Sequence, residues 1–275
     1  MSAPRSHFLE GAPRLHYLEW NPQGRETLVL LHGNSANAWW WQPLADALAN
    51  TQFRLLALDQ RGHGDSEWVR PPAYTPEDYA RDLARFIEAS RLVRPIVAGH
   101  SMGGISVLAF AAQFGQLARA AIAIDVAVSS TARRDRFLMR LKKLPTVIYP
   151  DRVTAIERFR LMPDEGAIPA TVLAKIAQRS LERTADGRYT LKFDRASFIG
   201  GDGLDVRAAI RQIAVPTLLI RAELSRIMTV EATAGAAQSN SLVRVAVIPR
   251  AFHHVPLESP DLLGRAIVEF TATLG

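Results

Sequence analysis

The 275-residue sequence contains no cysteine. This absence excludes disulfide bonds, thiolate metal sites and a cysteine nucleophile, and it is consistent with a reducing compartment. The sequence also lacks the zinc-binding pattern H-E-x-x-H and the phosphate-loop pattern G-x-x-x-x-G-K-[ST]. We therefore expect neither a metal nor another cofactor.

Long hydrophobic runs are also missing. A membrane-spanning helix needs about 20 apolar residues, and the best candidate, residues 118–128, is interrupted by Arg119 and Asp125. The first residues reach charged side chains without an apolar stretch, which argues against a signal peptide. With 48% hydrophobic and 22% charged residues, the composition is that of a globular protein. We expect a soluble, cytoplasmic protein that does not bind a membrane.

The formal net charge is +6, and basic residues gather in the middle of the chain. They are Arg133, Arg134, Arg136, Arg140, Lys142, Lys143, Arg152, Arg158 and Arg160. Apolar residues, among them Phe137 and Leu141, alternate with these cations at helical spacing, and no nucleic-acid-binding motif accompanies them. This pattern indicates a solvated helix face rather than a nucleic-acid partner. It leaves a preference for acidic substrates open.

Short apolar runs alternate with helical patterns, which is typical of a parallel sheet in an α/β protein. The expected strands are Phe8–Leu9, Leu15–Trp20, Thr27–His32, Phe53–Asp59, Pro95–Gly99, Ala120–Asp125, Thr217–Arg221 and Val243–Ile248, of which the first two form an antiparallel hairpin. The expected helices are Pro43–Ala49, Pro76–Ser90, Met102–Phe114, Val230–Gln238 and Pro260–Leu274. We predict a mostly parallel, twisted sheet of about eight strands flanked by helices.

The alternation stops after Asp125 and resumes at Pro216. Between them the pattern is helical and irregular, with several prolines and a Gly200–Gly203 run. An insertion between two strands of a regular sheet is best explained as a helical cap, or lid, over the carboxyl ends of the strands. We predict a core domain of residues 1–128 and 206–275, with the cap at residues 129–205, after the sixth strand.

The most informative motif is Gly99-His100-Ser101-Met102-Gly103, which fits G-x-S-x-G. It follows an apolar run and opens a small-residue helical run, as a nucleophile elbow requires. A serine hydroxyl becomes nucleophilic when a histidine takes its proton. His253 lies just past the last expected strand, where a loop can reach back to Ser101, and its neighbour His254 is the alternative.

At these residues the chain resembles the α/β-hydrolase family, in particular its lidded, esterase-like branch. The segments that carry the resemblance are Leu31–Asn34, Asp59–Ser66, Gly99–Gly104, Ile124–Ala127 and the block around His253, with a weaker echo at Asp186–Asp194. The resemblance implies an oxyanion hole formed by the backbone N–H groups of Asn34 and Met102. From their positions we expect structural roles for His63, which lies in a turn, and for His100, which precedes the serine of the elbow.

The acid of the triad departs from the pattern that many relatives show. In them the acid follows the strand Thr217–Arg221, but here Arg226 stands about where their aspartate would be. An arginine cannot accept the imidazole N–H. Other relatives carry the acid one strand earlier, at the position of Asp125. We predict Asp125 as the acid, with Glu223 as the alternative and Arg226 as an ionic partner of Asp125.

The chain carries three consecutive tryptophans, Trp39 to Trp41, after the predicted oxyanion turn. They cannot all face the core, because neighbouring side chains diverge. We predict that Trp39 and Trp40 bind substrate, together with Phe137 and Met162 from the cap.

These patterns predict a serine hydrolase that cleaves a small-molecule carboxylic ester, small or apolar, through an acyl-enzyme. Thioester, lactone or C–C bond hydrolysis stays open, as do a weakly catalytic ligand-binding protein and a homodimer.

Overall fold

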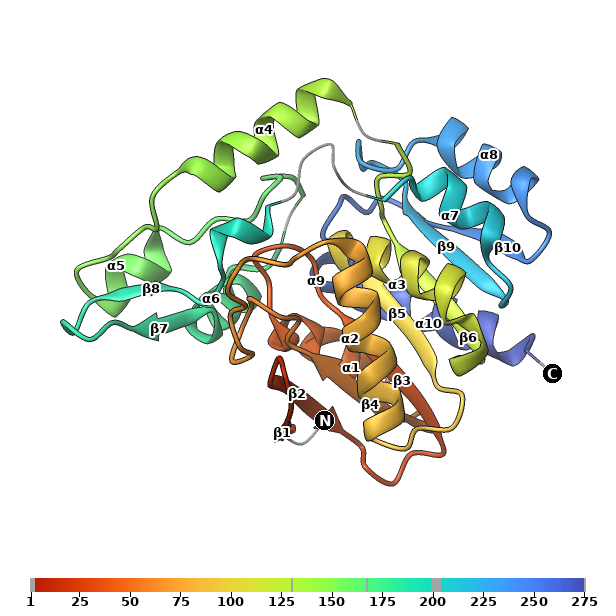
Figure 1. Ribbon diagram of the computed structural model, residues 1–275, viewed down its shortest axis with the longest axis horizontal. Coiled ribbons are helices and arrows are strands. Elements are labelled where there is room, and N and C mark those ends of the chain that lie inside the picture. The colour runs from red at the N-terminus through yellow and green to blue at the C-terminus, as the bar shows by residue number, and fades with distance from the viewer. Residues whose placement is uncertain (1–2, 130, 167, 199–203, 275) are drawn as a thin grey trace.

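The computed structural model describes residues 3–129, 131–166, 168–198 and 204–274, so the Gly200–Gly203 run lies outside the described residues. Figure 1 shows a twisted central sheet with helices on both faces and a separate group of elements beyond one edge. The strands of the sheet are β1 (Arg5–Leu9), β2 (Leu15–Trp20), β3 (Glu26–Leu31), β4 (Phe53–Leu58), β5 (Ile96–His100), β6 (Ala120–Ile124), β9 (Thr217–Ala222) and β10 (Val243–Ile248).

The strand order across the sheet is β1-β2-β4-β3-β5-β6-β9-β10. The β1–β2 hairpin is antiparallel and pairs antiparallel with β4, whereas the other six strands are parallel. The predicted mostly parallel, eight-stranded sheet is therefore confirmed. The central strands are buried on both faces, which explains their nearly continuous apolar sequences.

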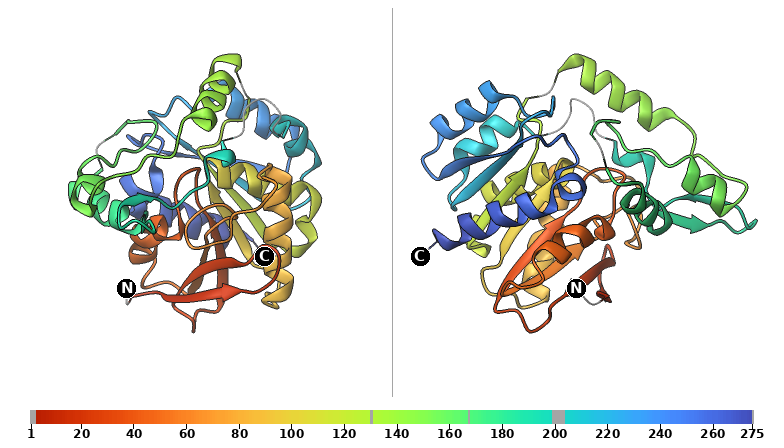
Figure 2. Two further views of the ribbon diagram at one scale, coloured as in Figure 1. Left: turned by 60° about the vertical axis from the view of Figure 1, so that its left-hand side comes forward. Right: turned by 180° about the vertical axis from the view of Figure 1, so that it is seen from behind.

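Helices cover the two faces of the sheet in separate groups. Those in the described part of the chain are α1 (Gln42–Ala47), α2 (Pro76–Ala89), α3 (Met102–Gln113), α4 (Ala132–Lys143), α5 (Arg152–Glu157), α6 (Ala170–Arg179), α7 (Val206–Gln212), α8 (Val230–Ser239), α9 (Val255–Glu258) and α10 (Pro260–Ala272), with short 3₁₀ turns at Ala38–Trp41, Gly115–Leu117 and Arg195–Ser197. Helices α2, α3, α7 and α8 contribute to one apolar core, and α1, α9 and α10 to the core on the opposite face (Figure 2).

Strand register brings distant residues to the same edge of the sheet. In the β5–β6 pair, His100 lies opposite Ile124, and the Ser101 N–H donates to the Ile124 carbonyl at 2.9 Å. The Asp125 N–H donates in turn to Ile220 on β9 at 2.7 Å. The carboxyl ends of parallel strands are where open α/β sheets place their ligands. Ser101 and Asp125 both follow strands directly at this edge.

The predicted cap segment, residues 129–205, contains α4, α5 and α6 and lies to one side of the sheet (Figure 1). It also contains an antiparallel pair, β7 (Leu181–Arg183) and β8 (Tyr189–Leu191), that the sequence analysis did not predict. Strands of three residues are too short to show an alternating pattern. The Asp186-Gly187 pair in their connection, with a φ of +86° at the glycine, was the available turn signal.

An apolar cluster joins this segment to the body of the protein. Its buried members are Ala36, Trp40, Phe159, Leu161, Ile176, Ala177 and Leu257. Trp40 and Leu257 come from the core, and Phe159, Leu161 and Ile176 come from the segment. Helix α4 is different, because it contains no buried residue.

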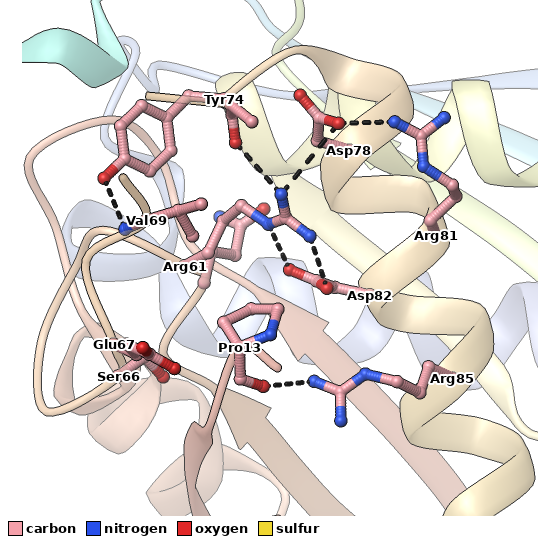
Figure 3. Close-up of polar contacts among 12 residues, drawn as sticks. Pro13, Arg61, Ser66, Glu67, Val69, Tyr74, Asp78, Arg81, Asp82 and Arg85 are labelled. Atoms are coloured by element: carbon pink, nitrogen blue, oxygen red, sulfur yellow. Dashed lines mark hydrogen bonds and ion pairs between the residues drawn. The ribbon is translucent and has the colours of Figure 1, made fainter. Parts of the chain in front are cut away.

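The Asp59–Ser66 motif forms a turn that a buried ion pair holds to α2 (Figure 3). The Arg61 guanidinium donates from Nε to Oδ2 of Asp82 at 2.6 Å and from Nη2 to Oδ1 at 2.8 Å. Its Nη1 donates to the Ala73 carbonyl at 3.1 Å. The turn also pairs with the predicted cap, since the Asp194 N–H donates to Gly62 at 2.7 Å. The motif thus has a structural role.

In the described part of the chain, no helix is both long and apolar enough to cross a membrane.

Candidate active site

The turn at Ser101 has the strained geometry of a nucleophile elbow. Ser101 adopts φ 54° and ψ −118°, a conformation that costs a non-glycine residue about 1–3 kcal/mol. A Cβ on Gly99 would lie 2.2 Å from the Gly103 carbonyl oxygen, and one on Gly103 would lie 2.4 Å from that of Leu31. Both glycines are therefore required by close backbone packing. The turn holds the Ser101 hydroxyl at the start of α3.

Three predicted site residues lie in one hydrogen-bonded row. The Nε2 atom of His253 is 3.1 Å from the Ser101 Oγ, and its Nδ1 atom is 2.7 Å from Oδ2 of Asp125. Asp125 is fully buried and His253 is 4% exposed, while Ser101 is partly accessible. In this row the aspartate accepts from Nδ1, which leaves Nε2 free to accept the serine proton.

Burial controls the protonation of this row. Loss of hydration lowers the pKa of His253 to about 3, and the charges of His254 and Arg134 act in the same direction. Loss of hydration also raises the pKa of Asp125 to about 7, against the hydrogen bonds from Ser225 and Ala222. At pH values above 7, the row therefore holds a neutral imidazole and an ionised carboxylate, the state in which His253 can act as a base.

Asp125 receives support from the loop that follows β9. The Ser225 hydroxyl donates to Oδ2 at 2.5 Å, and the Ala222 N–H donates to Oδ1 at 3.1 Å. The expected pairing with Arg226 is not present: Arg226 is exposed, and the carboxylate is satisfied by the adjacent serine instead. The sequence analysis missed Ser225, because a lone serine in a loop carries no distinguishing signal.

The alternative acid, Glu223, lies away from this row. It is exposed, and its Oε2 accepts from the Arg250 N–H at 2.7 Å, so it ties together the loops after β9 and β10.

The loop that carries His253 is fixed from two sides. His100 donates from Nε2 to the His253 carbonyl at 2.7 Å. Glu258 on α9 accepts from the N–H groups of Phe252 and His254 at 2.8 and 3.0 Å. The alternative base, His254, donates from Nε2 to the Pro163 carbonyl at 2.9 Å and is thereby joined to the predicted cap. The α9 turn was not predicted, since four residues are too few to show a helical period.

The residues predicted to donate to the oxyanion lie at the same cavity as the serine. Asn34 and Met102 both line the cavity that contains Ser101. Met102 is the first residue of α3, where backbone N–H groups have no partner within the helix. The Asn34 side chain is held by the Ser197 carbonyl at 3.2 Å. Neither backbone N–H has an acceptor among the described residues, so both are available to an anion.

The cavity has a volume of about 990 Å³, and most of its accessible lining is apolar. Trp40, Phe137 and Met162 line it, as expected, but Trp39 does not. Consecutive residues of a 3₁₀ turn point in different directions. Trp39 instead stacks against Arg179, whose Cζ atom lies 3.8 Å from the centroid of the Trp39 ring. Trp41 is buried in the core on the α1 side of the sheet. Trp39 thus lies outside the cavity in which we expected it to bind substrate.

One group in the described part of the chain, His16, Asp59 and Asp65, has its ligand atoms within 4.8 Å of one another, as a metal site would. However, Asp59 already accepts from His16 Nδ1 at 2.6 Å and from the N–H groups of Ala38 and Asp65 at 2.6 and 2.8 Å. These bonds make Asp59 the hydrogen-bonded centre of its turn.

The chain is similar to several known proteins. The 2-(acetamidomethylene)succinate hydrolase of Mesorhizobium japonicum is 29% identical over 247 residues, which cover 88% of this chain and 87% of that protein. The crystal structure of an E-2-(acetamidomethylene)succinate hydrolase superposes with a TM-score of 0.86 and 26% identity, over 98% of this chain and 100% of that one. A Mycobacterium tuberculosis esterase, at 21% identity, has a TM-score of 0.84 over 99% of this chain and 93% of its own, which shows the shared fold alone.

The model of the alpha/beta hydrolase family matches residues 28–266. The match runs from β3 into α10 and includes the serine turn, the Asp125 strand and the His253 loop. The hydrogen-bonded arrangement of Ser101, His253 and Asp125 has the chain order that the sequence motifs led us to expect. The chain belongs to the alpha/beta hydrolase family.

Proposed function

We propose that the protein is a serine hydrolase that cleaves carboxylic esters through an acyl-enzyme intermediate. The observation that supports this proposal is the row from Ser101 through His253 to Asp125, with distances of 3.1 and 2.7 Å. Such a row can take a proton from the serine during attack and return it to the leaving group.

In the first half-reaction, the Ser101 Oγ attacks the ester carbonyl carbon while its proton moves to His253 Nε2. Asp125 accepts the Nδ1–H bond and stabilises the imidazolium. The tetrahedral intermediate then collapses, the C–O bond breaks, and Nε2–H protonates the departing alcohol. In the second half, water gives its proton to Nε2, attacks the acyl carbon, and the acid leaves as Ser101 regains its proton.

The backbone N–H groups of Asn34 and Met102 would bind the oxyanion, at a gain of about 3–4 kcal/mol for each donor. Trp40, Phe137 and Met162 would contact the substrate. Their apolar character favours a small-molecule ester with an apolar or aromatic group. Residues 129–205 would act as the lid of this site, and the same machinery suits thioesters, lactones and activated C–C bonds.

A second candidate is hydrolysis of 2-(acetamidomethylene)succinate. It is favoured by the 29% identity to the Mesorhizobium hydrolase, which extends over 88% of this chain. Turnover of this compound, compared with that of p-nitrophenyl acetate by the same preparation, distinguishes the two candidates.

The proposal is tested with a fluorophosphonate probe followed by mass spectrometry. We expect an adduct on Ser101 and none on the Ser101→Ala variant. The Asp125→Asn variant should lose roughly 10³–10⁴-fold in p-nitrophenyl acetate turnover, because the imidazole loses its orienting anion. The exposed Asp261→Asn variant is the matched control. A protein without label and without turnover would be a ligand-binding relative, and labelling with an unchanged Asp125→Asn rate would place the acid elsewhere.

A further inference from the structure

The cavity beside Ser101 is apolar over most of its surface but contains several charged side chains. They are Arg134, Arg160, Arg195 and Arg207, together with Asp135, Asp164 and Asp205. Most of these groups have a structural partner or are open to solvent. A cation that has no hydrogen-bond acceptor in the protein and lies in the same cavity as Ser101 could bind an anionic ligand.

Two of the arginines donate hydrogen bonds to backbone carbonyls. Arg195 donates from Nε and Nη2 to the Leu141 carbonyl at 3.1 and 2.7 Å. Arg160 donates from Nη1 to the carbonyls of Glu157 and Phe159 at 2.7 and 2.8 Å. Arg207 is exposed, and the adjacent Asp205 uses its carboxylate to cap α7. Arg195 and Arg160 therefore have acceptors within the protein, and Arg207 is accessible to water, so none of the three needs a bound anion.

Arg134 differs from them. It lies in the first turn of α4 and is half-buried, and burial lowers the pKa of its guanidinium. In the described part of the chain, no carboxylate or carbonyl accepts a hydrogen bond from this side chain, and the neighbouring Asp135 carboxylate acts on it through its charge. A guanidinium carries five N–H donors, and leaving them unpaired away from water is costly. Such a group is poised for an anion from outside the protein.

Arg134 also acts on the catalytic row. Its positive charge contributes to the lowered pKa of His253, and both side chains line the same cavity as Ser101. An anionic group bound at Arg134 would therefore be part of the molecule whose ester reaches Ser101. The planar fork of the guanidinium matches a carboxylate, with two parallel N–H···O bonds. The apolar walls favour an organic chain over a phosphate-rich ligand.

We propose that Arg134 binds a free carboxylate of the substrate, so that the preferred esters of this enzyme carry an ionised carboxyl group. This inference rests on the proposed esterase function and adds the substrate class. The carboxylate can belong to the acyl part or to the alcohol part of the ester, and the experiment separates these two arrangements.

The test compares esters that differ only in charge. For the acyl side, the pair is mono-p-nitrophenyl glutarate and its monoamide, and for the alcohol side it is p-carboxyphenyl acetate and p-carbamoylphenyl acetate. The readout is the ratio of kcat/KM for the acid to that for the amide within each pair. Any effect of Arg134 on His253 changes both members alike and cancels in the ratio.

We expect Arg134→Gln to lower the ratio in one pair by at least about tenfold, equivalent to about 1.4 kcal/mol. Arg134→Lys should retain part of the preference, because it keeps the charge but loses the fork. The matched control is Arg133→Gln: this arginine is adjacent in the same helical turn but exposed and outside the cavity. It should leave both ratios unchanged. Ratios that do not respond to Arg134→Gln in either pair would overturn the inference.

A binding measurement separates this inference from the esterase proposal. Calorimetry with the Ser101→Ala variant measures the affinity for glutarate and for its monoamide without any turnover. We expect tighter binding of glutarate, and about tenfold weaker binding once Arg134→Gln is added. Equal affinities with and without Arg134 would contradict carboxylate recognition even in an active esterase. Arg134-dependent binding in a protein without turnover would overturn the esterase proposal alone.

Discussion

Asp125 is buried where β6 ends, and its two oxygens face three donors. His253 and Ser225 bind Oδ2, and the Ala222 N–H binds Oδ1. Burial penalises the charged form and raises the pKa of Asp125, and the bonds from Ser225 and Ala222 oppose this rise. Ser225 thus compensates part of the cost of holding an anion there.

We predict that Ser225→Ala moves the acid limb of the pH–rate profile to higher pH. The active state requires ionised Asp125, so activity is lost as the pH falls through the pKa of this group, about 7 in the native protein. Removing the hydroxyl removes a bond that lowers this pKa. A hydrogen bond to a charged group contributes about 1.5–3 kcal/mol, so we expect a shift of at least about one pH unit in kcat/KM.

Ser225→Thr keeps the hydroxyl, so its pH–rate profile should have the same acid limb as that of the unchanged protein. A Ser225→Ala rate that falls equally at every pH would mean that the serine only shapes the loop. An unchanged profile would mean that this hydrogen bond has no electrostatic effect on the reaction.

At the scale of elements, the turn at Asp59–Ser66 depends on α2. Arg61 and Asp82 form a two-bond ion pair that is 9% and 6% exposed by residue. Removing one partner of a buried pair leaves an uncompensated charge, whereas replacing both with apolar residues avoids this cost. We therefore expect the pair to fix the position of the turn against the helix and to add little to the free energy of unfolding.

We predict that Arg61→Leu lowers the free energy of unfolding by about 3–5 kcal/mol, measured by urea denaturation, because Asp82 loses its counter-ion. The Arg61→Leu/Asp82→Leu double variant should recover most of this loss. Arg81→Leu on the same helix is the control: it removes the exposed partner of Asp78 and should cost about 1 kcal/mol or less. A double variant as unstable as the single one would indicate that the pair contributes net stability.

The sequence predicted the eight-stranded sheet because long apolar runs with glycine and proline punctuation reflect burial on both faces. It also predicted which side chains lie together at Ser101, since the elbow and the strand ends are local features. It could not predict β7 and β8, where three-residue strands leave no period. Nor could it identify Ser225 or exclude Glu223, because the contacts of Asp125 arise from residues about 100 positions away.

At the scale of the whole molecule, the predicted cap is attached to the core by a small apolar cluster and by polar contacts, among them the ion pairs of Asp194 with Arg70 and of Lys192 with Asp65. Phe159, Leu161 and Ile176 contact Trp40 and Leu257 there. The sheet, in contrast, is packed between two much larger clusters. A segment held by a small apolar cluster can open locally at a lower free energy than the rest of the protein.

We predict that Ile176→Ala loosens this segment while the sheet stays folded. Ile176 is 3% exposed and does not line the cavity, so its truncation removes packing without touching the candidate site. Truncation of a buried isoleucine costs about 2–5 kcal/mol. Hydrogen exchange should therefore accelerate in α5, α6, β7 and β8 and stay slow in β3, β5 and β6.

The control is Val153→Ala on α5, whose side chain is 64% exposed and should change little. If the segment is a separate unit, Ile176→Ala should change the KM of an ester more than its kcat. Substrate binding depends in part on cavity residues of this segment, whereas the chemical step depends on residues at the edge of the sheet. Acceleration that spreads equally to the sheet strands would contradict this division, since the segment and the sheet would then unfold as one cooperative body. The small size of the apolar junction favours a separate unit, because the cluster that joins the two parts contains seven buried residues.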